Sequence, residues 1–320
     1  MKRVPGLLLT VAIVVVLALI PAVSGKASTR ESMSTILMAI ALASSLNILL
    51  GYTGYVSFGH IVFFGVGGYV GFYTVSQLGW SLWLSVLAGG VAAGLLALGL
   101  GKSILHLRGA YFALATIGVN EAMRALVNNF KPFGGPVGMD LKFSVYKEYG
   151  GAATALWTVY WAVAAITVIV IVVSYVVKRS KFGLGLLAIR EDEDAAEVMG
   201  VNAPNAKTWS YVLSAVFPGL IGVLFFFKNG NIEPGDAFRL QQSIELIVMV
   251  MLGGFGTVIG PVLGAGVYQQ LRRSLLTSPV FKNVQLAVAG LLLLLIILFI
   301  PGGAIGWLRK RFPRLRKVLE

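Results

Sequence analysis

Long apolar stretches alternate with short polar segments along the whole chain. Most are long enough, at 1.5 Å per helical residue, to cross about 30 Å of hydrocarbon. They lack the strict alternation of barrel strands, so each is expected to be a helix. The stretches are residues 7–24, 34–50, 60–77, 82–101, 109–127, 153–177, 208–227, 243–271 and 284–301. This pattern predicts an all-α fold, a polytopic transmembrane helical bundle.

Two regions of this pattern are interrupted by glycine. The stretch 243–271 is broken by glycines and a proline within 253–261, and we expect two short passes or a re-entrant pair there. A second glycine-rich segment, 51–60, precedes the third stretch. Broken helices at membrane depth are tolerated where they are buried in protein or line a cavity. Tight helix packing and a discontinuous helix beside a path are both compatible with these glycines. Dividing 243–271 gives about ten crossings.

The basic residues predict the orientation. They cluster at 178–181 and in the tail 308–320, and Lys and Arg accumulate in cytoplasmic segments. Both termini are therefore predicted to be cytoplasmic, and nine spans with an external tail is the alternative. The segment 1–24 has basic residues, an apolar run and then small residues, which fits either a cleaved secretory signal or a first span. The span is preferred because it fits this topology.

Composition supports the bilayer as the main solvent. Of 320 residues, 57% are hydrophobic and 12% are charged, about half the charged fraction of a soluble domain. The net charge of +13 does not indicate nucleic-acid binding, because the basic residues lie between apolar runs. Cysteine is absent and there are two histidines, so neither a disulfide framework nor a His- or Cys-based metal site is expected.

A polar segment, residues 180–206, separates two apolar stretches and is predicted to be cytoplasmic. Its part 188–201 suits one short helix, with acidic residues in the first turns and Gly200 as the C-terminal cap. Ile189, Ala196 and Met199 are predicted to form an apolar edge, with Val201 as a further candidate, and such an edge needs a partner. The residues that we expect to contact this partner are Ile189, Arg190, Glu191, Asp192, Glu193, Asp194, Ala195, Ala196, Met199 and Gly200.

Several motifs resemble one transporter family. Asp194-Ala195-Ala196 followed by Gly200 resembles the E-A-A…G coupling loop of ABC importer permeases, with Asp in place of the first Glu. Five further segments, in the same order, resemble the branched-chain amino-acid permeases of the LivM type: NILLGYTG (47–54), SFGH (57–60), FFGVGGY (63–69), LRGAYFALAT (107–116) and MLGGFGTVIGP (251–261).

The resemblance implies a single transmembrane permease domain, 1–320, of the type II ABC-importer kind in a bacterial inner membrane. It implies import of leucine, isoleucine and valine. The expected partners are a second permease (LivH type), two ABC ATPase subunits and a periplasmic binding protein. The chain has no GxxxxGK[ST] phosphate loop. It is therefore not expected to be an enzyme or to bind a cofactor, and ATP binding and hydrolysis are expected on the partner ATPase subunits.

Polar residues inside the stretches are candidates for a path. Tyr52, Ser57, His60, Tyr111, Phe112 and Thr116 are predicted to line it, although aromatic residues also serve as interfacial anchors and His60 also suits a structural role. Glu121 and Arg124 are three residues apart on one helix and are predicted to form an intramembrane ion pair, with either a structural role or a role in gating or in the path. Glu245 is expected at a water-facing boundary.

Two alternatives remain open from the sequence. A urea or short-amide importer has the same layout within the same family. A stand-alone channel or secondary carrier, from a different class, needs no ATPase. A membrane enzyme is not expected, because no set of paired carboxylates or of nucleophile and base is visible.

Overall fold

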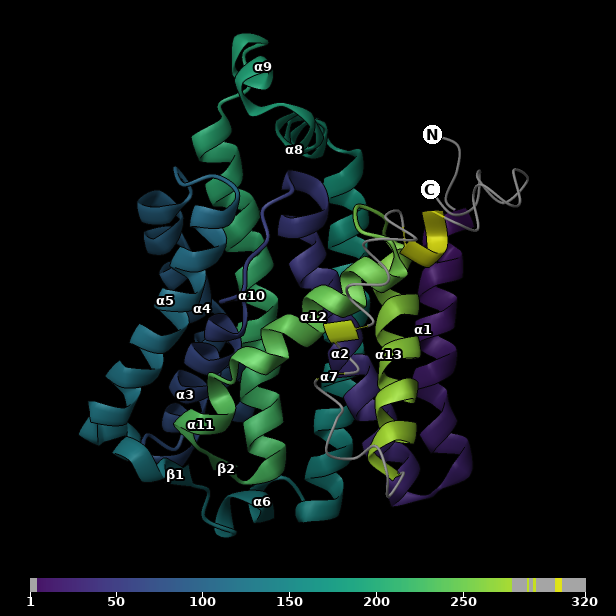
Figure 1. The fold of residues 1–320 in the computed structure, drawn as a ribbon. Coiled ribbons are helices and arrows are strands. Elements are labelled where there is room, and N and C mark those ends of the chain that lie inside the picture. The colour runs from purple at the N-terminus through teal and green to yellow at the C-terminus, as the bar shows by residue number, and fades with distance from the viewer. Residues whose placement is uncertain (1–4, 278–286, 288–289, 292–302, 307–320) are drawn as a thin grey trace.

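The computed structural model describes residues 5–277, 287, 290–291 and 303–306, which form a bundle of helices (Figure 1). The helices along the bundle are α1 (Pro5–Ser24), α2 (Ala27–Thr53), α3 (Ile61–Ser76), α4 (Leu82–Ile104), α5 (Ala110–Asn129), α7 (Ala152–Arg179), α10 (Ala203–Asn229), α12 (Leu240–Gly253) and α13 (Ile259–Thr277). The shorter elements are η1 (Lys131–Phe133), η2 (Gly135–Val137), β1 (Met139–Asp140), α6 (Ser144–Glu148), α8 (Lys181–Glu191), α9 (Glu193–Val198), β2 (Asn231–Ile232) and α11 (Pro234–Ala237).

The predicted helical bundle is confirmed within the described residues. Five described helices are long and apolar enough to cross a membrane, namely α1, α2, α4, α7 and α10, and α3 is a shorter apolar helix. Helix α5, although 20 residues long, is not among the five. The predicted break of 243–271 is confirmed, because α12 ends and α13 begins within it. The predicted span 284–301 lies largely outside the described residues, and the tail 308–320 wholly so.

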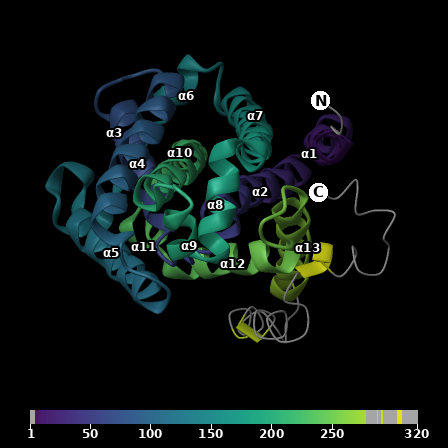
Figure 2. The same cartoon turned by 90° about the horizontal axis from the view of Figure 1, so that it is seen from above.

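Helix α2 lies at the centre of the bundle and packs against α1, α7, α10, α12 and α13 (Figure 2). On one side, α3, α4 and α10 approach one another closely through glycine. A Cβ atom on Gly67 would come within 2.6 Å of the Gly219 carbonyl oxygen, so the backbones are nearly in contact. Without a hydrophobic drive between helices in lipid, such close van der Waals contact is what holds the helices together.

Helix α1 is an integral part of this packing. Its Val14 and Ala18 are buried, and the Tyr160 hydroxyl of α7 donates a hydrogen bond of 2.8 Å to the Ala18 carbonyl oxygen. The segment therefore packs as a first span does.

The two ends of the bundle differ. At one end, β1 pairs with β2 in a two-stranded antiparallel sheet, with α6 beside it, and the Tyr146 hydroxyl of α6 donates to the Phe227 carbonyl oxygen at 2.6 Å. At the other end, α8 and α9 project beyond the bundle (Figure 1). The loops 54–60 and 105–109 lie at this α8–α9 end, next to these two helices. The polar segment 180–206 is therefore the main projection of the described chain at that end.

Glu245 and Arg272 form a buried ion pair that was not predicted from the sequence. The Glu245 carboxylate is buried between α12 and α13, where it lies 3.0 Å from an Arg272 guanidinium nitrogen and accepts a hydrogen bond of 3.1 Å from Gln241. The expectation that Glu245 faces water is therefore wrong. Helices α12 and α13 form an antiparallel pair, and this brings a carboxylate and a guanidinium together that are 27 residues apart.

Candidate functional site: the α8–α9 hairpin and the helix breaks beneath it

The segment 188–201 is two helices rather than the single helix predicted. Helix α8 ends at Glu191, and the extended backbone of Asp192 separates it from α9. The Asp192 carboxylate then caps α9 by accepting a hydrogen bond of 3.0 Å from the Ala195 amide. Helix α9 ends at Val198 with Met199 as its C-cap residue, and Gly200 follows with a φ of +90°, so glycine terminates the helix where it was predicted to do so. The chain thus forms a helical hairpin, α8–α9.

Because the helix is broken at Asp192, some of the predicted contact residues face away from the bundle and others face toward it. Six of them are exposed, namely Glu191, Asp192, Asp194, Ala195, Met199 and Gly200. The other four face the bundle and are buried or half-buried, namely Ile189, Arg190, Glu193 and Ala196. The predicted apolar edge is therefore wrong, because Ile189 and Ala196 pack inside the chain. The apolar tip of the hairpin is instead Val198 and Met199, which are 86% and 84% exposed.

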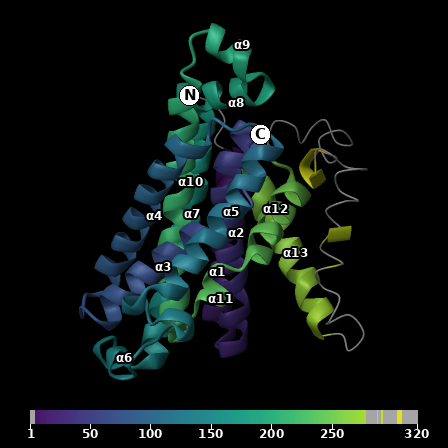
Figure 3. The ribbon, with the colours of Figure 1, turned by 60° about the vertical axis from the view of Figure 1, so that its left-hand side comes forward.

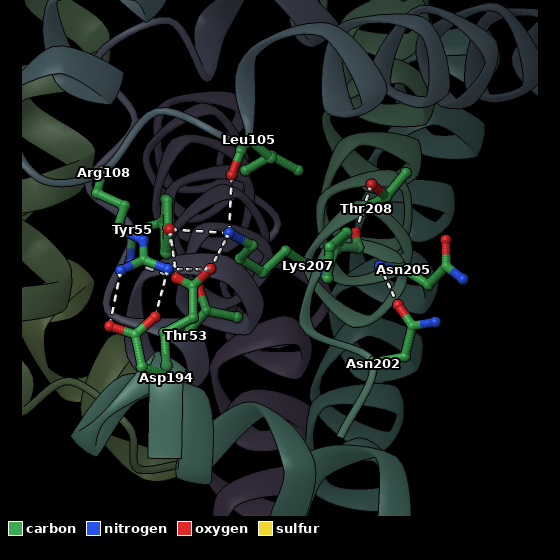
Figure 4. A network of polar contacts seen from close by, with 11 residues as sticks. Thr53, Tyr55, Leu105, Arg108, Asp194, Asn202, Asn205, Lys207 and Thr208 are labelled. Atoms are coloured by element: carbon green, nitrogen blue, oxygen red, sulfur yellow. Dashed lines mark hydrogen bonds and ion pairs between the residues drawn. The ribbon is translucent and has the colours of Figure 1, made fainter. Parts of the chain in front are cut away.

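A buried ion pair fastens the hairpin to the bundle (Figure 4). The Lys207 ammonium, in the second turn of α10, lies 2.6 Å from the Glu193 carboxylate and also donates to the Leu105 carbonyl oxygen at 2.8 Å. It donates a third hydrogen bond, of 3.0 Å, to the Tyr55 hydroxyl, which donates to Glu193 at 2.7 Å. All three ammonium protons of this buried lysine thus have acceptors, as a buried charge requires.

A second, exposed pair lies beside it. Two guanidinium nitrogens of Arg108 donate to the two Asp194 oxygens at 3.1 and 2.8 Å. The hydrogen bonds from Arg108 hold the pKa of Asp194 below its usual range. Burial alone raises the pKa of Glu193, but hydrogen bonds from Lys207 and Tyr55 and the charges around it outweigh burial and lower this pKa. Both carboxyls are therefore ionised at neutral pH.

Arg190 connects the hairpin to the first glycine break. Its guanidinium donates a hydrogen bond of 2.9 Å to the Gly51 carbonyl oxygen in the last turn of α2. The same group lies 5.6 Å from the centre of the Phe255 ring, between α12 and α13. It also lies 2.8 Å from the Glu191 carboxylate. One side chain of α8 therefore touches both glycine-broken regions.

The two breaks lie side by side although about 200 residues separate them in the chain. The Asn47 side chain donates to the Thr257 carbonyl oxygen at 3.0 Å and accepts from the Gly256 amide at 2.9 Å. These bonds satisfy backbone groups that the break leaves without helical partners. A Cβ atom on Gly51 would come within 2.6 Å of the Gly256 nitrogen, which explains why glycine occupies this position.

Two cavities flank this junction. One, of about 490 Å³, lies between the 54–58 loop, the start of α5 and the hairpin. The other, of about 500 Å³, is lined mostly by apolar side chains, including Ile247, Met251 and Phe255. Arg190 lines both cavities, as do residues of the 54–58 loop. The site thus joins apolar space, the guanidinium groups of Arg108 and Arg190, and the carboxylates of Glu191 and Glu193.

The predicted path residues line neither cavity. Tyr52, Ser57, His60, Phe112 and Thr116 are buried, and Tyr111 is exposed on α5. The Tyr52 hydroxyl bonds to Ser174 of α7 at 2.8 Å, and Thr116 accepts from the Phe58 amide at 3.1 Å. These contacts belong to the packed bundle, so the role of the six residues in a path stays a prediction.

The residues that hold the hairpin were not predicted from the sequence. Tyr55, Arg108 and Lys207 come from three separate segments, and Asn47 lies within an apolar stretch. One signal was available: Lys207 is a single charge at the start of an apolar helix, a position that favours pairing with an acidic neighbour. Among the described residues there is no group of three or more His, Cys, Asp or Glu side chains able to hold a metal ion.

Fold and site together define a class of protein: a multi-pass helical membrane permease, with a polar hairpin at one end that contacts breaks in its transmembrane helices. The chain belongs to the family described as "Branched-chain amino acid transport system / permease component", whose sequence profile matches residues 28–298. No solved structure matches the chain.

Curated relatives agree with this assignment. The chain is similar to the high-affinity branched-chain amino acid transport system permease protein LivM of Escherichia coli, with 27% identity over 84% of this chain and 68% of the relative. It is also similar to LivH of Salmonella typhimurium, with 23% identity over 83% of this chain and 90% of the relative. A protein of Methanocaldococcus jannaschii, probable LivM, is 26% identical over 61% of this chain and 59% of its own length.

Proposed function

We propose that the chain is a translocating permease subunit of an ATP-driven importer for leucine, isoleucine and valine. The names of the LivM and LivH relatives support this substrate class. The cavity beside Arg190 supports it as well, because its lining suits a small apolar side chain and its guanidinium suits a carboxylate.

The complete importer has further subunits in this proposal. A second permease of the LivH type completes the membrane part, as the similarity of this chain to both LivM and LivH supports. Two ABC ATPases bind and hydrolyse ATP, so this chain itself carries neither cofactor nor catalytic residues. A periplasmic protein delivers the amino acid. The chain lies in the inner membrane with the α8–α9 end and both termini in the cytoplasm.

The observation that carries the proposal is the construction of the α8–α9 hairpin. Its tip, Val198 and Met199, is apolar and exposed, and acidic side chains surround it, which suits a partner protein with an apolar groove and basic rim. Its base is fixed to α10 through the buried pair of Glu193 and Lys207. A force on the tip is therefore transmitted to the bundle rather than lost in a flexible loop.

Arg190 transmits that force to the two helix breaks. Because its guanidinium contacts both Gly51 and Phe255, displacement of α8 changes the contacts at both helix breaks at once. Those breaks, unlike continuous helix, open by rotation about a few backbone bonds. In the proposal, ATP binding and hydrolysis in the partner subunits move α8–α9 and thereby open and close the path.

Substitution at the tip tests the coupling. Val198→Asp and Met199→Asp place a charge in the proposed interface, and we expect ATP-driven leucine uptake to fall at least about tenfold. Val137→Asp is the matched control, since Val137 is an equally exposed valine, 80%, at the opposite end of the bundle. Uptake is measured in proteoliposomes that contain the complete importer. Uptake unaffected by both tip substitutions refutes the coupling role.

Two further measurements separate the alternatives. Uptake of labelled leucine and of labelled urea by a strain lacking the chain, with and without complementation, identifies the substrate class. Purification of the tagged chain together with its bound subunits addresses the class of transporter. A complex that hydrolyses ATP supports the importer, whereas uptake by the purified chain alone identifies a channel or secondary carrier.

A further inference from the structure

Helix α5 presents one face to the bundle and leaves the other open. Its buried residues, Phe112, Thr116, Asn120 and Val127, recur at intervals of about one or two turns. Phe112 packs edge-on against Tyr55, and the Asn120 side chain donates to the Phe238 carbonyl oxygen at 2.9 Å. The opposite face forms an exposed stripe of Tyr111, Leu114, Gly118, Glu121, Ala122, Arg124, Ala125 and Leu126. Figure 3 shows this helix at the front of the bundle.

The stripe contains an ion pair at membrane depth. Glu121 follows the start of α5 by 11 residues, which is about 16 Å along a helix about 30 Å long. Its carboxylate lies 3.7 Å from the Arg124 guanidinium, and their side chains are 53% and 46% exposed. Within the described residues neither side chain makes a hydrogen bond. Both groups therefore keep hydrogen-bonding capacity that the described part of the chain does not use.

Helix α4 shows what a lipid-facing surface of this protein looks like. Its exposed residues include Trp83, Leu84, Leu87, Val91 and Leu95, all large and apolar. The α5 stripe has large residues at its ends, Tyr111, Leu114 and Leu126, but small residues and two opposite charges between them. Ionised side chains are costly in hydrocarbon and usually face water, a cavity or a partner in the bundle. The open face of α5 is therefore not a lipid face.

We propose that this face of α5 is a wall of the translocation path and that Glu121 and Arg124 together bind the zwitterionic end of an amino acid in transit. The ammonium group of the substrate pairs with Glu121 and its carboxylate with Arg124, while its side chain lies over the small residues of the stripe. The inference rests on the proposed function and specifies which groups of this chain meet the substrate.

Charge supports an amino acid as the occupant. An amino-acid zwitterion carries one positive and one negative group on the same carbon. The α5 pair offers a carboxylate for the positive group and a guanidinium for the negative group, side by side and without a hydrogen bond between them. Because the pair is net neutral, it binds neither simple anions nor simple cations strongly, which favours a neutral zwitterion over both. A weak, exposed site also suits a path, because the substrate must leave it again.

Cysteine accessibility tests the wall. The chain has no native cysteine, so Gly118→Cys and Ala122→Cys introduce single thiols, and a Cβ atom on Gly118 meets no other atom within 4 Å. The control is Val91→Cys, on the exposed face of α4. Val91 and Ala122 lie nine and seven residues from the helix ends at the β1–β2 end, so their depths are matched.

The reagent is a charged, membrane-impermeant methanethiosulfonate, applied to the complete importer in membranes. Only a thiolate reacts, and thiolates form in water rather than in hydrocarbon. We expect both α5 thiols to react at least about tenfold faster than the α4 thiol, and leucine to slow them. Equal, slow reaction at all three positions overturns the proposal in favour of lipid. Reaction that appears only after removal of the second permease overturns it in favour of a dry contact between permeases.

Neutral substitutions test the zwitterion site. Glu121→Gln and Arg124→Gln are each expected to raise the KM for leucine uptake about tenfold, and the double variant to raise it at least as far. A purely structural ion pair gives the opposite pattern, because the double variant leaves no unpaired charge and restores the wild-type KM. Uptake by the unaltered importer is measured in parallel. If it transports no leucine, the proposed function fails, while the thiol reactivities without substrate still decide whether α5 faces water.

Discussion

Neutralising Glu193 is expected to release the α8–α9 hairpin. In Glu193→Gln the Lys207 ammonium, 3% exposed, keeps its charge but loses its counterion. Removal of one partner from a buried ion pair costs about 3–5 kcal/mol, because an uncompensated charge stays buried. We expect the lower end, about 3 kcal/mol, since the glutamine oxygen still accepts a hydrogen bond and the side chain at this position is 12% exposed.

Hydrogen exchange of the backbone amides of α9 measures this loss. The Ala196 amide donates to the Asp192 carbonyl oxygen and the Met199 amide to that of Ala195, so both report on the hairpin. A loss of about 3 kcal/mol corresponds to exchange that is about 100-fold faster. The matched control is Asp194→Asn, which removes the neighbouring but exposed pair with Arg108 and is expected to leave the exchange of the α9 amides nearly unchanged, because an exposed ion pair contributes little to stability.

The pH dependence follows from the same contacts. The pKa of Glu193 is lowered in the folded chain, so its contribution to the stability of the hairpin is complete above its ordinary pKa of 4.5. The contribution falls as the pH drops below this value and is lost as the pH passes the lowered pKa. The difference in hairpin stability between wild type and Glu193→Gln, measured by amide exchange, must therefore be constant at neutral pH and disappear in acid. If the α9 amides exchange at the same rate in Glu193→Gln and in Asp194→Asn, the buried pair is not what holds the hairpin to the bundle.

Two further predictions concern the bundle. Gly256→Ala is expected to destabilise the chain by about 1–2 kcal/mol in thermal unfolding, because Gly256 has a φ of +74° and its Cβ would lie 2.7 Å from an Arg190 nitrogen. Gly266→Ala is expected to be neutral or stabilising, because a Cβ atom on this helical glycine meets no other atom within 4 Å. A larger loss of stability in Gly266→Ala than in Gly256→Ala contradicts this reasoning. Glu245→Gln is expected to cost about 3–5 kcal/mol, and adding Arg272→Met to recover most of it, since no unpaired charge remains. Additive losses in the double variant contradict the buried pairing.

Most of the helical architecture could be predicted from the sequence because the signals are local. A long apolar stretch is sufficient to predict a helix in lipid, since the backbone has no other way to satisfy its hydrogen bonds there. Glycine runs at 51–60 and 253–261 indicated where helices break. Gly200 indicated where α9 ends, and the spacing of Glu121 and Arg124 indicated their pairing, confirmed at 3.7 Å.

Contacts between distant segments could not be predicted in this way. Glu193 meets Lys207 and Tyr55, and Glu245 meets Arg272, only because the helices that carry them lie next to each other. The apolar edge was predicted wrongly for a related reason. A single extended residue, Asp192, rotates α9 relative to α8 and turns Ala196 inward, and helical spacing does not reveal such a break.

The sequence by itself determined that this is a multi-pass helical membrane protein with two broken regions and a polar segment between two apolar stretches, because length, hydropathy and glycine act over one or two turns. Only the tertiary structure decided that Arg190 joins the hairpin to both breaks and that the charges of α5 face outward. Which side of a helix is covered depends on its neighbours, and no local pattern specifies them.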